Sequence, residues 1–136
     1  MKKAVYLLTL ILSACGPSSS EDQVRTAAEK FAEAYFSCRY VEAAQFVTPA
    51  SQKHLQFIAS QVTAEDVEQL RSLARKPDFE VLSTEQLGDS TAEVVVEVHR
   101  FMQMDTIGRP CHLTENGRFT LMLRKQPDGQ WLTELR

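Results

Sequence analysis

The sequence predicts an α+β fold in which N-terminal helices pack on one face of a curved four-stranded antiparallel sheet. The first observation behind this prediction is a change of period. Apolar residues recur at helical spacing up to residue 76 and alternate along the chain from residue 79 onward. The second is that turn-forming stretches containing Gly88 and Gly129 separate the alternating segments. Such turns are expected where consecutive strands run antiparallel.

Four helices are expected in the first part of the domain. The first begins near Ser20, a candidate N-cap followed by two acidic residues. Its apolar face consists of Val24, Ala27, Ala28, Phe31, Ala34, Tyr35 and Cys38. A short helix over residues 41–47 follows. A third opens at Pro49, because proline is favoured at the first helical position, and a fourth opens at Thr63.

Four strands are expected in the second part. They cover residues 79–87, 91–104, 112–125 and 131–135. The second is rich in β-branched residues, which favour strands because their side chains pack well on a pleated surface.

The N-terminal segment has the pattern of an export signal. Lys2 and Lys3 precede an apolar stretch over residues 4–12, which is too short to span a bilayer because a spanning helix needs about 20 residues. The stretch runs into residues 12–15, LSAC, which resemble the bacterial lipobox.

This resemblance implies that residues 1–14 are a signal peptide that is removed and that Cys15 is lipidated on its sulfur. Residues 15–20 would then be a short tether to the membrane, and residues 21–136 the α+β domain. Gly16 stands where aspartate would favour retention in the inner membrane, so the resemblance implies an outer-membrane location facing the periplasm. A secretory signal without lipidation is the alternative.

Charge and cysteine content restrict the partners. The full chain carries a formal net charge of −3, and removal of Lys2 and Lys3 with the expected signal peptide makes it −5. This acidic balance, and the lack of a block of five or more basic residues, argue against nucleic acid as a partner. Apart from Cys15, the chain contains Cys38 and Cys111. Two thiols in one small exported domain are usually paired, so a Cys38–Cys111 disulfide is expected. A metal site that joins these cysteines to His112 is the competing interpretation, and it lacks the paired spacing of metal motifs.

The order of the expected elements is similar to that of the nuclear-transport-factor-2-like, cystatin-like superfamily. The resemblance includes the TPAS stretch at residues 48–51 and the positions of Tyr35, Ala43 and Trp131. It is closest in kind to small exported lipoproteins of uncharacterised function. It implies a cone between helices and sheet, and dimers that form through the sheet. Unlike the larger members of the superfamily, this chain has no expected strand pair between its helices. The resemblance therefore does not fix the depth of the cone. Members include isomerases, dehydratases, ligand binders and interaction modules, so the fold does not choose among functions.

No hydrolase, phosphate-loop or dithiol motif is present, so we assign no catalytic residue, metal or cofactor. Arg100 shares one face of the second strand with valines and with Met102, and it is a candidate for binding an anionic head group whose tail packs on the methionines. A bulge that shifts the alternation, or a structural acid beside Arg100, is the alternative. Tyr35 and Trp131 are candidates for the pocket mouth, because each combines an apolar body with a polar tip.

The histidines give weaker signals. On the opposite face of the same strand, His99 and Glu97 have the composition of an acid–base pair, but such residues usually form a solvated face. His54 and His112 are too scattered to form a metal site.

The hypothesis we favour from sequence is a membrane-anchored envelope lipoprotein that acts as a non-enzymatic binding or protein-interaction module. Its partner would be a small amphiphilic ligand or another envelope protein. The alternative is a small isomerase or lyase that uses an acid or histidine in the pocket. These two hypotheses differ in whether an ionisable group with a shifted pKa lines the cavity. A structural spacer that binds no ligand is the third hypothesis.

Lipidation of Cys15 can be tested by metabolic labelling with an alkyne analogue of palmitate. The unaltered protein is expected to incorporate the label, and Cys15→Ser is expected to lose it, because the lipid is attached through the Cys15 sulfur. Cys38→Ser should keep the label. Equal labelling of the Cys15→Ser variant would contradict the lipobox interpretation.

Overall fold

The computed structural model describes residues 19–73, 76–104 and 111–135. The expected signal peptide, Cys15 and residues 16–18 of the tether lie outside the described residues. The helical elements are α2 (Ser20–Phe36), α3 (Tyr40–Ala43), η1 (Ala44–Phe46), η2 (Pro49–Ser51), α4 (Gln52–Gln61) and α5 (Ala64–Arg71), of which η1 and η2 are 3-10 turns. The strands are β1 (Asp78–Gln86), β2 (Thr91–Gln103), β3 (His112–Lys125) and β4 (Trp131–Glu134). The predicted α+β class is confirmed. None of the helices in the described ranges is long and apolar enough to cross a membrane.

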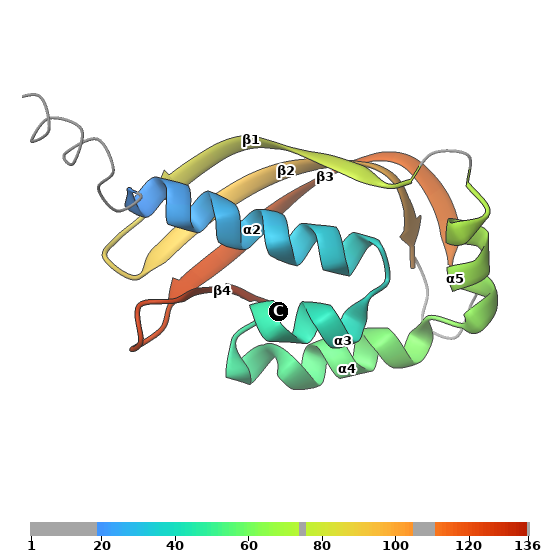
Figure 1. Ribbon diagram of the computed structural model, residues 1–136, viewed down its shortest axis with the longest axis horizontal. Coiled ribbons are helices and arrows are strands. Elements are labelled where there is room, and N and C mark those ends of the chain that lie inside the picture. Colours follow the sequence, from blue (N-terminus) through green and yellow to red (C-terminus); the bar gives the residue numbers. More distant parts are fainter. Residues whose placement is uncertain (1–18, 74–75, 105–110, 136) are drawn as a thin grey trace, which may run out of the picture.

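The four strands form one antiparallel sheet in the order β1-β2-β3-β4. The sheet is curved, and α2, α3 and α4 lie on its concave side, whereas α5 stands at the end where β2 leaves the sheet and β3 enters it (Figure 1). The register between β1 and β2 shifts between Val81 and Ser83, which marks a β-bulge. A bulge increases the local bend of its strand, in keeping with the curvature of the sheet.

Helix α2 runs along the concave face and supplies much of the core. Its N-cap is Ser19, one residue before the predicted Ser20, because the Ser19 hydroxyl accepts a hydrogen bond from the Asp22 N–H at 3.2 Å. The buried residues of α2 are Val24, Ala28, Phe31, Ala32, Ala34 and Phe36. Full burial of an apolar side chain such as Phe31 contributes about 1.5–3 kcal/mol, so this face holds the helix on the sheet.

The buried side of β2 changes after Val98. The buried residues of this strand are Ala92, Val94, Val96, Val98 and Phe101. Arg100 has a φ of 59°, and this left-handed conformation shifts the alternation by one residue, so that Phe101 enters the core instead of Arg100. The predicted continuation of the apolar face from Val98 to Arg100 is therefore wrong.

The last strand ties the sheet to the helical part. Val47 forms a parallel bridge with Thr133, and the Thr48 N–H donates to the Thr133 carbonyl at 2.9 Å. Two residues farther along, the Leu135 N–H donates to the buried Ser51 hydroxyl at 2.9 Å. Strand β4 is thus held by β3 on one side and by the segment before α4 on the other.

Gly117 allows two aromatic rings to lie against the sheet. It pairs with Val98 across β2 and β3, and a Cβ atom at this position would lie 2.6 Å from Cζ of Phe101 and 3.1 Å from Cε2 of Phe119. Only a residue without a side chain fits beneath these rings.

Replacement of Gly117 by alanine is expected to destabilise the domain by about 1–3 kcal/mol, because the Phe101 ring must shift to make room for the new methyl group. Urea unfolding followed by circular dichroism measures this change. Gly88→Ala is the matched control, since a Cβ at Gly88 meets nothing within 4 Å. An equal loss in both variants would contradict the steric explanation.

Candidate functional site

A cavity of about 330 Å³ lies where the end of α2, α3 and α4 meet the ends of β2 and β3. Its described lining consists of Tyr35, Phe36, Cys38, Tyr40, Ile58, Val62, Phe101, Met102, Gln103, Met104, Cys111 and Phe119. The volume is within the range of small-molecule sites, which are usually apolar with a few polar groups. This cavity is the best candidate for a functional site in the described part of the chain.

Aromatic rings form one wall of the cavity. Phe36, at the end of α2, lies 4.9 Å from Phe119 and 5.7 Å from Phe101 between ring centroids. Tyr35 packs edge-on against Phe36 at 5.1 Å and against Tyr40 at 5.8 Å. Contacts of this geometry contribute about 0.5–1.5 kcal/mol each beyond burial of their area, so the wall is held in place by the rings themselves.

Cys38 occupies the turn that ends α2. Its φ is 59°, and the Cys38 and Arg39 N–H groups donate to the carbonyls of Tyr35 and Ala34 at 3.1 and 2.9 Å. This arrangement closes a helix with a residue in the left-handed region, where glycine is usual because a Cβ atom is disfavoured. The Cys38 sulfur accepts a hydrogen bond from the Tyr40 hydroxyl at 3.7 Å. A strained backbone therefore places a thiol on the cavity wall.

Cys111 is buried and is held by Asp66 of α5. Asp66 belongs to a capping box, in which its carboxylate accepts from the Thr63 N–H at 2.9 Å and its N–H donates to the Thr63 hydroxyl at 3.2 Å. The same carboxylate accepts hydrogen bonds from the backbone and the thiol of Cys111. The helix cap and the cavity wall thus share one buried acid.

The predicted Cys38–Cys111 disulfide is not present, and both residues are free thiols. Each sulfur instead has a polar partner of its own, which is Tyr40 for Cys38 and Asp66 for Cys111. The prediction was right in one respect, since the fold does bring both cysteines to the same cavity.

The ionisable groups of the lining are all held in their neutral forms. Burial raises the pKa of Tyr35, Tyr40 and Cys38. Burial, and then the Asp66 carboxylate, raise the pKa of Cys111 to about 11. No carboxylate, imidazole, ammonium or guanidinium is among the described lining residues. The lining is therefore uncharged at neutral pH.

Two of the four predicted ligand-binding residues, Tyr35 and Met102, line this cavity, and the other two do not. Arg100 donates instead to the Asp78 carboxylate at 3.1 Å and to the Lys76 carbonyl at 3.3 Å. Trp131 is only 4 % exposed and packs in the core.

Sequence reasoning missed Tyr40 and the free thiols as wall residues. Met104 had been expected beside Met102 as one of the methionines that would pack around a ligand tail, and it does line the cavity. Nothing in the local sequence points to Tyr40, which reaches the cavity only because α2 ends where it does.

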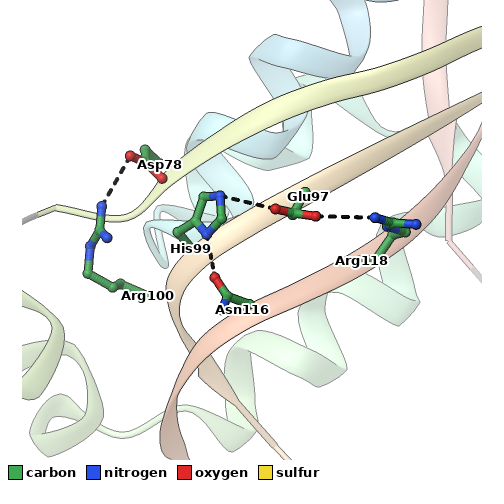
Figure 2. A network of polar contacts seen from close by, with 6 residues as sticks. All are labelled: Asp78, Glu97, His99, Arg100, Asn116 and Arg118. Atoms are coloured by element: carbon green, nitrogen blue, oxygen red, sulfur yellow. Dashed lines mark hydrogen bonds and ion pairs between the residues drawn. The ribbon is translucent and has the colours of Figure 1, made fainter.

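His99 and Glu97 lie on the opposite face of the sheet from the cavity. Figure 2 shows the His99 ring between Asn116 and Glu97, with Arg118 on the far side of Glu97. The His99 Nδ1 lies 2.5 Å from the Asn116 Oδ1, and its Nε2 lies 3.4 Å from Glu97. Glu97 also pairs with Arg118 at 3.3 Å. These cross-strand contacts form a partly exposed polar network of the kind expected on a solvated face.

Comparisons with known proteins address the fold. No protein-family model matches the chain, and no curated protein matches it at a significant level. A ketosteroid isomerase-like protein from Erwinia carotovora atroseptica has a similar structure, with a TM-score of 0.56 and 14% identity, covering 86% of this chain and 92% of that chain. An NTF-2 like protein of unknown function from Shewanella oneidensis has a TM-score of 0.55 and 17% identity, covering 82% and 92%. These likenesses show a nuclear-transport-factor-2-like fold, and at such identities they show the fold alone.

Asp66 makes the stability of the domain depend on pH. Burial by itself would raise the pKa of the Asp66 carboxyl, but hydrogen bonds from Thr63 and Cys111 stabilise the carboxylate more, so the pKa is lowered. The ionised form therefore stabilises the fold above the unfolded pKa of about 3.9, and this contribution is lost as pH falls toward the folded pKa. Asp66→Asn is expected to cost about 0.5–2 kcal/mol at pH 7, and the difference should shrink below about pH 4.

Urea unfolding at several pH values measures this difference. Glu65→Gln is the control, because Glu65 is an exposed acid in the same first turn of α5 and should change stability less. A loss in Asp66→Asn that does not vary with pH would contradict the assignment to the charge.

Proposed function

We propose that this protein is a non-enzymatic binding module, held at the bacterial cell envelope by a lipid on Cys15, and that the cavity binds a small, uncharged amphiphilic molecule. The envelope location rests on residues 1–15 and their resemblance to a lipobox signal. The binding role rests on the cavity.

One observation carries the binding role: the described lining is apolar and holds only neutral polar groups. The aromatic rings and methionines offer contact area to an apolar body, and methionine adapts to ligands of different shape. The hydroxyls of Tyr35 and Tyr40 and the amide of Gln103 offer a few hydrogen-bonding groups, which is the usual composition of a ligand site. A charged organic ligand would lose its hydration there without gaining an opposite charge, because it cannot displace the protons of the thiols and hydroxyls.

An isomerase or lyase is the alternative function, and one solved structure of this fold is named for its likeness to ketosteroid isomerase. Such a reaction needs a general base whose pKa lies near the working pH. The described lining offers hydroxyls and thiols with raised pKa values, and the buried Asp66 accepts hydrogen bonds from Thr63 and Cys111. These features favour binding over acid–base chemistry.

Binding can be measured with N-phenyl-1-naphthylamine, an uncharged apolar probe whose fluorescence rises in an apolar site. Residues 18–136, which contain every described residue, allow the assay without a lipid or detergent. We expect Val62→Trp to weaken probe binding by about tenfold or more, a change of about 1.4 kcal/mol, because the indole would occupy the cavity that Val62 lines. Probe binding should not change between about pH 6 and 8, since the lining groups stay neutral over that range.

Val41→Trp is the matched control, since Val41 is 89 % exposed and lies outside the cavity. Circular dichroism of both variants separates a filled cavity from a failure to fold. Equal weakening in the two variants would contradict the proposed site. Probe binding that titrates near pH 6–7 would instead favour the acid–base alternative.

A further inference from the structure

The sulfur-containing side chains of this domain are concentrated in one place. The described part of the chain contains five of them, at Cys38, Met102, Met104, Cys111 and Met122. Four of the five line the cavity, and Met122 alone does not. The four come from three parts of the fold, namely the turn after α2, the end of β2, and the residue that precedes β3.

The backbone at Cys38 adds a second observation. Cysteine here occupies a left-handed position at a helix end, a conformation that costs a residue with a side chain about 1–2 kcal/mol. Strain of this kind is found where a side chain is needed for a task. What the strained turn delivers at Cys38 is a thiol on the cavity wall.

We propose that the cavity contains a binding site for a soft monovalent cation of the copper group, Cu(I), with Cys38 and Cys111 as thiolate ligands and Met102 and Met104 as thioether ligands. Thiolate and thioether sulfurs are the ligands that select Cu(I). Cu(I) replaces the proton of each thiol, so two Cu–S bonds form, two protons are released to solvent, and no oxidation state changes. This site uses the same cavity as the proposed amphiphile but does not depend on that proposal.

The surroundings favour this class of metal over others. Within the described ranges, no three residues among histidine, cysteine, aspartate and glutamate gather closely enough to hold a metal ion, so the usual ligand sets for zinc and calcium are not offered there.

The test is titration of the reduced, lipidated protein in detergent with Ag(I), which resembles Cu(I) but does not change oxidation state. Native mass spectrometry gives the stoichiometry, and competition with bathocuproine disulfonate under anaerobic conditions gives the Cu(I) affinity. We expect one ion per protein. Changes that only surround a metal site cost about 10–100-fold in affinity, so loss of ligands should cost at least as much.

Three variants decide the outcome. Cys38→Ser combined with Cys111→Ser should abolish tight binding, and Met102→Leu combined with Met104→Leu should weaken Cu(I) at least tenfold while both thiols remain. Met122→Leu is the matched control and should bind as the unaltered protein does, since Met122 lies outside the cavity. Unchanged affinity in the double methionine variant, Zn(II) bound as tightly as Cu(I), or no ion bound by the reduced protein would each overturn the proposal. Thermal melting of each variant confirms that it is folded.

Discussion

The position of α2 across the concave face of the sheet is the constraint on which the rest of this structure depends. The helix has 17 residues, so it is about 25 Å long, whereas the 13 residues of β2 extend over about 43 Å. One helix therefore cannot cover the full length of the strands that it packs against. The chain turns at Cys38, and Tyr40 of α3 and Ile58 of α4 then line a cavity together with residues at the end of β2. The cavity therefore lies where α2 ends and the later helices begin.

The chemistry of the cavity follows from that arrangement. Residues at the end of α2 face residues at the end of β2, and both ends are rich in aromatic and sulfur-containing side chains. Such groups lose little on burial, whereas a carboxylate in the same place would need a partner. The one buried acid nearby, Asp66, has its partners in the capping box and in Cys111. The uncharged lining of the cavity thus follows from the aromatic and sulfur-containing side chains that the ends of α2 and β2 bring together.

The sequence could predict the elements because their periods are regular. The four expected strands agree with the observed strands to within a residue or two at each end, since alternation and turn residues are local signals. Arg100 shows where such reasoning ends. A single residue in the left-handed conformation reverses which side chains of the strand face the core. The local sequence does not predict this conformation at Arg100, because arginine has no preference for it.

The candidate site was less predictable than the fold. Trp131 was selected for its amphipathic side chain, but which cavity a side chain lines depends on the elements that meet around it. Trp131 packs in the core and lines a different cavity, between α2 and the turn before β4. The disulfide was expected from the cellular compartment, which bears on oxidation but not on where two sulfur atoms point. Tyr35 was selected for the same reason as Trp131, and Met102 was selected as a neighbour of Arg100. Both line the cavity because they lie near the ends of α2 and β2, where the cavity forms.

The hydrogen bonds between β4 and the segment before α4 affect the stage at which the domain can fold. Thr48 and Ser51 form hydrogen bonds with Thr133 and Leu135, which lie more than 80 residues later in the chain. The helical part therefore gains these contacts only after β4 has been synthesised. Contacts of such long sequence separation form late, because the loop between them must first be closed. A nascent chain that lacks these residues would stay loosely packed while it is synthesised. For a protein that we propose to be exported, this delay is useful, since a chain without a finished core can still be threaded through a narrow channel.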